Sequence, residues 1–198
     1  MKRLEGKSHL WAWVVSRVFD PIVEIPLILV LVAWVALSNG LRWRFIVFLL
    51  VFEAILPAGF FVFGLLTKKI KDWDITRRQD RMGLYFFTIF THLFGVIYAY
   101  FLGKHELSEV LLILWGLAVI FAVVTYFWKI SVHAGVNGAL VAVVNHYYGW
   151  GRFWWLVVVL LLVLWARVVM KKHTVAQVSM GAIMALAWVS FGLSVISN

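Results

Sequence analysis

The chain has 198 residues, of which 64% are hydrophobic and only 14% are charged. A soluble domain of this length is about half apolar and about a quarter charged, so this composition would leave large apolar patches facing water. A lipid environment removes that difficulty, because a surface in lipid needs no polar coat. The composition therefore excludes an ordinary soluble domain and indicates a membrane protein.

The net charge of +9 and the absence of Cys narrow the function further. Because the basic residues flank apolar segments, we expect membrane lipids and anionic substrates as partners and no nucleic acid. Without Cys, the chain cannot use disulfides, cysteine–metal sites or thiol catalysis.

The first predicted element is an interfacial helix over residues 8–19, SHLWAWVVSRVF. This segment is amphipathic and rich in Trp, a pattern that is typical of helices lying at the membrane surface. Apolar segments of spanning length follow it, since a helix needs roughly 20 residues to cross a bilayer. The spans are expected at 21–38, 44–66, 83–103, 107–128, 131–148, 153–170 and 174–196.

The sequence thus predicts an all-α, polytopic transmembrane helical bundle of six to seven spans, forming a single membrane domain over 1–198. The segment 131–148 is the least hydrophobic, and we expect the other helices to enclose it. Small residues in 174–196 should let neighbouring helices approach closely. These small residues are Ser179, Gly181, Ala182, Ala185 and Ala187.

Basic residues are distributed unevenly across the predicted membrane. Seven spans place the N-terminus and the segments 67–82, 129–133 and 167–173 on one side, which holds fourteen of the 18 Lys and Arg residues. By the positive-inside rule this side is cytoplasmic, and we expect the cell membrane as the location. The fourteen residues are Lys2, Arg3, Lys7, Arg17, Lys68, Lys69, Lys71, Arg77, Arg78, Arg81, Lys129, Arg167, Lys171 and Lys172.

Three separated pieces of the sequence fall on this basic side and suit one chemical task. Guanidinium and ammonium groups, together with the N–H groups that open a helix, can hold the oxygens of a phosphate. Two histidines can supply a nucleophile and a general acid. The pieces are Lys71-x6-Arg78, Ser131-x-His133 and Arg167-x5-His173-x3-Gln177.

These pieces resemble the three-part signature of the type-2 phosphatidic acid phosphatase superfamily. That signature reads Lys-x6-Arg-Pro, then Pro-Ser-Gly-His, then Ser-Arg-x5-His-x3-Asp. The superfamily includes bacterial undecaprenyl-pyrophosphate and phosphatidylglycerophosphate phosphatases and, on a similar helical core, vanadium haloperoxidases. The resemblance covers 71–177 and implies a phosphatase-like core over about 67–198.

The resemblance implies a membrane phosphatase that hydrolyses a lipid or polyprenyl (pyro)phosphate without a metal or other cofactor. His173 would attack phosphorus and form a phosphohistidine, and His133 would protonate the leaving oxygen. Hydrolysis of the phosphohistidine by water would complete the reaction. The residues implied to bind the phosphoryl oxygens are Lys71, Arg78, Ser131 and Arg167.

The chain departs from the signature at four positions. Gln79 and Ile130 stand where the family has Pro, and Val132 stands where it has Gly. Gln177 replaces the Asp that orients the nucleophilic imidazole, and its oxygen could orient the ring without supplying charge. In serine proteases the equivalent loss of charge lowers kcat by about 10⁴-fold. Two alternatives therefore stay open: a weak or inactive relative that binds or moves a phospholipid, and a lipid phosphotransferase.

Acidic residues within spans are energetically costly and usually functional. Glu24 and Glu53 are two such residues. Either could be protonated, could pair with a base, or could supply the carboxylate that Gln177 lacks.

The remaining polar residues have simpler expected roles. Asp72, Asp74 and Asp80 should pair with neighbouring bases, with a Mg²⁺ site as the alternative. Within the spans, polar side chains should form hydrogen bonds between helices. The side chains in question are His92, Asn137, Asn145 and His146.

Overall fold

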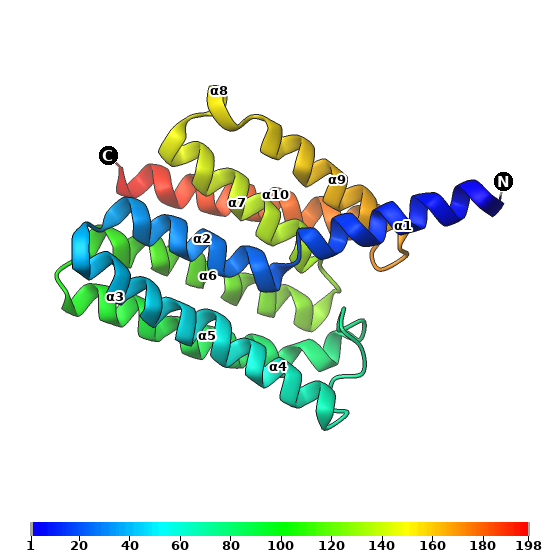
Figure 1. The fold of residues 1–198 in the computed structure, drawn as a ribbon, viewed down its shortest axis with the longest axis horizontal. Helices are drawn as coiled ribbons and strands as arrows, with labels where there is room; N and C mark the ends of the chain where they lie inside the picture. The colour runs from blue at the N-terminus through cyan, green and yellow to red at the C-terminus, as the bar shows by residue number, and fades with distance from the viewer. Residues whose placement is uncertain (1, 198) are drawn as a thin grey trace. The chain divides into compact units, whose positions relative to one another are not determined.

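The chain consists of helices joined by turns in the computed structural model (Figure 1), which describes residues 2–197. Side chains are described for 6–38 and 40–197, so those of Lys2 and Arg3 lie outside the described residues. No strand occurs in 2–197, which confirms the all-α class. Among the described residues, five stretches are long and apolar enough to cross a membrane: Gly6–Ala36, Gly40–Leu66, Arg78–Phe101, His105–Phe127 and Val175–Ile196.

The helices follow the predicted spans closely, with additional short elements. Gly6–Ala36 contains two helices with a turn at Phe19 and Asp20 between them, and Gly40–Leu66 contains a π-helical segment. The order is α1 (Lys2–Val18), α2 (Pro21–Ala36), α3 (Asn39–Leu49), η1 (Leu50–Ile55), α4 (Leu56–Leu66), α5 (Arg78–Phe101), α6 (His105–Phe127), α7 (Val132–Tyr148), α8 (Trp150–Phe153), α9 (Trp155–Val169) and α10 (Val175–Ile196).

Several helices begin earlier than predicted, because hydropathy locates only the apolar part of a helix. Helix α1 starts at Lys2 and not at residue 8, α3 at Asn39 and not at residue 44, and α5 at Arg78 and not at residue 83. The first turn of α5 contains Asp80, whose negative charge is favourable beside a helix N-terminus. Arg78 therefore lies on a helix, although the sequence placed it in a loop.

Residue contacts divide the chain into two compact units. Unit 1 comprises Met1–Glu24 and Lys129–Phe191, and unit 2 comprises Ile25–Trp128 and Gly192–Asn198. The single domain expected from the sequence stays a prediction.

In unit 1, α9 packs against both α1 and α7 (Figure 1). Most residues of α7 are buried, as expected for the least hydrophobic span. Helices α7 and α10 approach closely at two glycines: a methyl group on Gly181 would lie 2.7 Å from Ser131 O, and one on Gly138 would lie 2.9 Å from Ala182 O. The predicted small-residue contact of the last helix is therefore present.

In unit 2, α5 packs along α6, and α4 and η1 pack against α5. Aromatic rings join α5 to its neighbours: Phe45 of α3 stacks on Tyr98 with centroids 5.4 Å apart, and Phe60 of α4 stacks on Phe87 at 4.5 Å. Such pairs add to the packing energy that burial of apolar area supplies.

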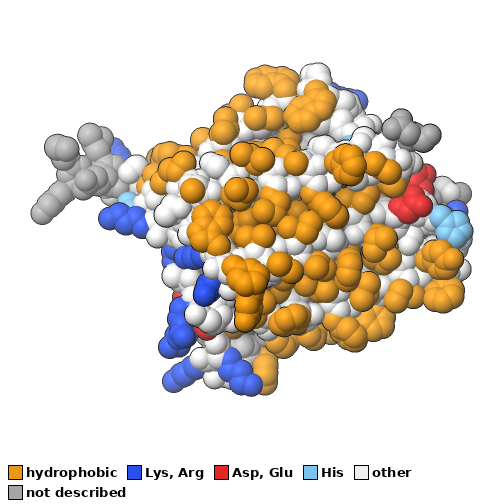
Figure 2. Space-filling model, turned by 180° about the vertical axis from the view of Figure 1, so that it is seen from behind, with side chains coloured by type: hydrophobic (Ala, Val, Ile, Leu, Met, Phe, Trp, Pro, Cys, Tyr) orange, Lys and Arg blue, Asp and Glu red, His pale blue; other side chains and the backbone are white. Residues whose placement is uncertain are grey.

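Large apolar side chains are exposed along the long helices of both units. Figure 2 shows hydrophobic side chains over most of the face that it draws, with Lys and Arg side chains toward its edges. An apolar surface this extensive is stable only against lipid. The chain is a helical membrane protein. Examples of exposed side chains are Leu66, Phe86, Phe101, Phe127, Leu161, Ile183 and Phe191.

Candidate functional site

The second and third predicted pieces meet in unit 1, where the start of α7 adjoins the turn between α9 and α10. Lys129 Nζ donates a 2.8 Å hydrogen bond to Lys172 O, and Ser131 N donates to Gln177 O at 3.4 Å. Within the turn, the backbone N–H of His173 donates to Arg167 O at 3.3 Å. These bonds hold two segments that lie far apart in the sequence at one end of the helices.

His173 is 6% exposed, and its Nδ1 lies 3.2 Å from Gln177 Oε1. The same oxygen accepts a hydrogen bond from Thr174 N at 3.1 Å, while Gln177 N donates to Thr174 Oγ1 at 3.3 Å. This reciprocal pair is a capping box that opens α10. Because a backbone N–H can only donate, the Gln177 atom that meets it is the amide oxygen. That oxygen in turn requires Nδ1 to carry a hydrogen, so in the neutral imidazole Nε2 carries the lone pair.

Ser131 is fully buried at the N-cap of α7. Its hydroxyl accepts a hydrogen bond from Ala134 N at 3.4 Å, which satisfies one of the N–H groups that a helix start leaves unpaired. The residue therefore has a structural role, whether or not it also contacts a phosphate.

Arg167 is 1% exposed in the last turn of α9 and is bound by residues from other helices. Its Nη1 donates a 2.7 Å hydrogen bond to Ser16 Oγ of α1 and lies 3.5 Å from His133 Nε2. His133 Nε2 also lies 3.6 Å from Asp20 Oδ2, so a protonated His133 forms an ion pair with that carboxylate. The structure thus brings His133 and Arg167 together, as the predicted site requires.

Asp20 and Ser16 were not identified as site residues from the sequence. Asp20 accepts hydrogen bonds from Arg17 Nη1 at 3.2 Å and from Ile22 N at 3.1 Å, so it also caps the start of α2. The Asp-Pro pair at 20–21 is a helix-start signal that could have marked this carboxylate. No sequence signal of this kind marks Ser16.

Glu24 is buried beside the same end of α7 and takes an amide partner. Asn137 Nδ2 donates to Glu24 Oε2 at 2.6 Å and to His133 O at 2.9 Å. Among the described residues, Glu24 Oε1 accepts no hydrogen bond. Asn137 therefore bonds between helices as predicted, whereas Asn145 donates to Val141 O within its own helix.

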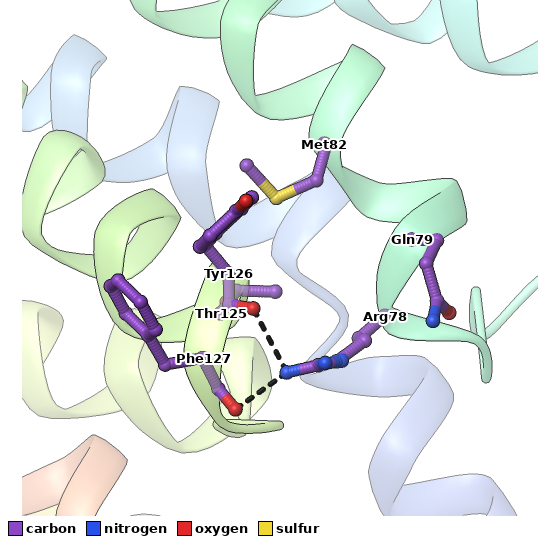
Figure 3. A pocket seen from close by; sticks show the side chains of 6 residues that line it. All are labelled: Arg78, Gln79, Met82, Thr125, Tyr126 and Phe127. Atoms are coloured by element: carbon purple, nitrogen blue, oxygen red, sulfur yellow. Dashed lines mark hydrogen bonds between the residues drawn. The ribbon is translucent and has the colours of Figure 1, made fainter.

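The first predicted piece lies in unit 2. Lys71 is exposed in the turn between α4 and α5. The guanidinium of Arg78 points toward the end of α6 (Figure 3), where its Nη1 donates to Tyr126 O at 2.9 Å and to Phe127 O at 2.5 Å. Arg78 thereby satisfies carbonyl groups that a helix end leaves unpaired, a role missed from the sequence. Convergence of Lys71 and Arg78 with the two histidines stays a prediction.

A pocket of about 390 Å³ opens beside Arg78 (Figure 3). Apolar side chains and the Arg78 guanidinium both contribute to it, a combination that suits an amphiphilic molecule. It is lined by Arg78, Gln79, Met82, Thr125, Tyr126 and Phe127.

The acidic residues before and at the start of α5 have local partners. Asp80 pairs with Arg77 Nε at 4.0 Å, as predicted. The prediction for Asp72 is wrong, because its carboxylate accepts from Thr76 N and from Thr76 Oγ1, the latter at 2.8 Å. Within the described residues, no three His, Asp or Glu side chains gather as a metal site would require.

Comparison of the chain with family models, with curated proteins and with solved structures gives no match. The superfamily resemblance therefore stays a prediction that rests on residue spacing. The contacts of His173, His133 and Arg167 are the structural observations on which a function can be argued.

Proposed function

We propose that the chain is a membrane phosphatase, a divergent relative of the type-2 phosphatidic acid phosphatases, that hydrolyses a lipid or polyprenyl (pyro)phosphate. The contact between His173 Nδ1 and Gln177 Oε1 carries the proposal. It fixes the tautomer in which Nε2 has the lone pair that a nucleophile needs.

The proposed reaction has two steps. First, His173 Nε2 attacks phosphorus, the N–P bond forms, and the P–O bond to the lipid breaks while His133 donates its proton to the leaving oxygen. Second, water attacks the phosphohistidine and gives its proton to His133. The N–P bond then breaks, and inorganic phosphate leaves.

The charged groups around His133 fit the role of general acid. Asp20 Oδ2, 3.6 Å from Nε2, stabilises the protonated imidazole that must deliver a proton. Arg167 supplies positive charge for the phosphoryl oxygens, and the N–H groups at the start of α7 add neutral donors. Lys71 and Arg78 are further candidates for binding the phosphoryl oxygens, as the superfamily resemblance implies.

The apolar surface of the helices supports a lipid as substrate. Hydrolysis at helix ends would leave the alkyl chain among lipids while the phosphate reaches water. From the distribution of Lys and Arg, we propose that the site faces the cytoplasm and that the protein resides in the cell membrane.

Phosphate release from defined lipids tests the proposal. The purified full-length protein is placed in vesicles that contain phosphatidate, phosphatidylglycerophosphate or a polyprenyl (pyro)phosphate. We expect inorganic phosphate from at least one of them, and we expect His173→Ala to abolish release. His9→Ala, at an exposed position of α1, is the matched control and should retain activity. Equal release by the wild type and His173→Ala for every lipid would refute hydrolysis through His173.

A second candidate function is binding or movement of a phospholipid without hydrolysis. Gln177 favours it, because its hydrogen bonds with Thr174 open α10 and would be needed in an inactive protein too. A binder would retain lipid phosphates in a vesicle flotation assay and release no phosphate.

A further inference from the structure

Unit 2 contains a buried acid–imidazole pair that the proposed phosphatase reaction does not use. Glu53 Oε2 lies 2.9 Å from His92 Nδ1, and His92 Nε2 lies 3.0 Å from Leu111 O. Residues Glu53 and His92 are 4% and 7% exposed. Glu53 is the midpoint of the apolar stretch Gly40–Leu66, so the pair lies deep within the spans.

The hydrogen bonds determine how many protons the pair holds. The Leu111 carbonyl can only accept, so His92 Nε2 carries a hydrogen. The second ring nitrogen then shares one further proton with Glu53: either Nδ1–H donates to the carboxylate, or the carboxylic acid donates to Nδ1. Both arrangements leave the pair electrically neutral, and neutrality is strongly favoured in an apolar interior.

The second oxygen of the carboxylate indicates that the pair is more than a structural contact. Glu53 Oε1 is buried and accepts no hydrogen bond from the described residues. A methyl group added at Gly95 would lie 3.3 Å from Oε1 and 3.1 Å from Leu49 Cδ2. Oε1 therefore faces the backbone of Gly95, which has no side chain. Glu53 also lies on the π-helix η1, a deviation that is frequent at functional sites.

The ionisable groups on the neighbouring helices do not bond to the pair. On α5 the nearest are Tyr85, which interacts with Thr125, and Tyr98, which stacks on Phe45. Helix α4 carries no ionisable side chain. Arg42 and Arg44 lie more than two turns before Glu53. The ionisable residues of α6 are all exposed: His105, Glu106, Glu109 and Tyr126.

We propose that Glu53 and His92 form a proton-binding site in the interior of unit 2, whose ligand is the single proton shared by Oε2 and Nδ1. Release of this proton to water leaves a carboxylate and a neutral imidazole, so the charge of the site falls from zero to minus one. Uptake from water restores the neutral pair. Ionisable groups placed in this way within spans are used as proton relays. The proposal involves unit 2 alone and does not depend on phosphatase activity.

The test uses the full-length protein with ¹⁵N-labelled histidine in phospholipid nanodiscs. Nuclear magnetic resonance reports the protonation of both ring nitrogens, and comparison with His92→Gln assigns the signals. In the wild type, we expect Nε2 to stay protonated while Nδ1 shows a shared proton that is lost on alkaline titration. In Glu53→Gln, which keeps the side-chain shape but cannot supply a proton, Nδ1 should be unprotonated throughout.

A potentiometric titration of the same samples counts the exchangeable protons. The wild type should release one more proton per chain than Glu53→Gln, whereas Glu109→Gln, the exposed control, should leave the His92 spectrum unchanged. Identical His92 spectra in the wild type and Glu53→Gln would refute the shared proton. A shared proton that never leaves at any pH where the protein stays folded would refute exchange. If Glu53→Gln does not fold, the wild-type titration of Nδ1 alone decides the question.

Discussion

The guanidinium of Arg167 and the hydroxyl of Ser16 form a 2.7 Å hydrogen bond between α9 and α1. Arg167 is almost completely buried, so each of its hydrogen bonds replaces one that water would otherwise supply. A bond to a buried charged group contributes more than a bond between neutral groups. The end of α1 therefore helps to hold the cation of the proposed phosphate site in place.

Replacing Ser16 by Ala should lower both stability and activity. Loss of the acceptor leaves a buried charged donor without its partner, at a cost of about 1–3 kcal/mol. Thermal unfolding followed by circular dichroism measures the first effect, and phosphate release measures the second. Ser16→Thr keeps the hydroxyl and should lose much less stability and much less activity than Ser16→Ala. Equal stability of Ser16→Ala and the wild type would contradict this role for the hydrogen bond.

Replacing Gln177 by Asp should increase turnover. A carboxylate stabilises the positive charge that His173 develops during attack, and in serine proteases such a charge changes kcat by up to about 10⁴-fold. Gln177→Met, which cannot accept from Nδ1, should reduce phosphate release below the wild-type rate. Steady-state kcat for the three proteins is the measurement.

The capping role of Gln177 needs a separate control. Thr174→Ala removes the other half of the capping box and should cost about 1 kcal/mol of stability. If Thr174→Ala lowers kcat as much as Gln177→Met does, the effect of Gln177 on turnover comes from the helix start and not from orientation of His173.

Much of the fold could be predicted from the sequence because hydrophobic length dominates it. The predicted segment 131–148 differs by one residue from α7, since Ser131 is an N-cap and Gly149 ends the helix. Polar helix ends were missed, as for Arg78 in α5, because hydropathy carries no information about them. The sequence predicted that small residues of the last helix allow a close approach, but it did not predict that Gly181 would contact Ser131.

The candidate site could be predicted only in part. Spacing identified His133 and Arg167, which lie 3.5 Å apart, but not their contacts with Asp20 and Ser16. Those contacts join segments that are remote in the sequence, and no local pattern records such a pairing. The partner of Glu53 also depends on how η1 and α5 pack, so the sequence could offer only alternatives for it.

Replacing Asp20 by Asn separates its charge from its capping role. An Asn oxygen can still accept from Ile22 N and keep the start of α2 intact, while the ion pair with His133 is lost. We expect a small change in stability and a fall in kcat of about 10²-fold or more, since general acid catalysis contributes about 10²–10⁴-fold. Asp20→Ala should lose about 1 kcal/mol of stability as well. An unchanged kcat in Asp20→Asn would exclude Asp20 from the proton transfer.

Substitutions of Arg78 distinguish its cap on α6 from a contact with substrate. Arg78→Gln retains a donor for the carbonyls of Tyr126 and Phe127 but removes the charge. If Arg78 binds the phosphate, KM for the lipid should rise about tenfold while the melting temperature changes little. Steady-state kinetics gives KM, and thermal unfolding of the same preparation gives the melting temperature. A loss of stability with an unchanged KM would leave Arg78 as a helix cap only.

Replacing Gly181 by Ala should destabilise unit 1 and disturb the proposed site together. The added methyl group would lie 2.7 Å from the backbone oxygen of Ser131, so one helix must move, at a cost of about 1–3 kcal/mol. Because Ser131 opens α7 two residues before His133, that movement should also reduce phosphate release. Gly59→Ala is the matched control, since nothing lies within 4 Å of the added methyl group and Ala favours a helix by about 0.5–1 kcal/mol over Gly. The melting temperature should therefore fall for Gly181→Ala and rise for Gly59→Ala. A rise for both variants would show that packing against Ser131 does not limit the side chain at position 181.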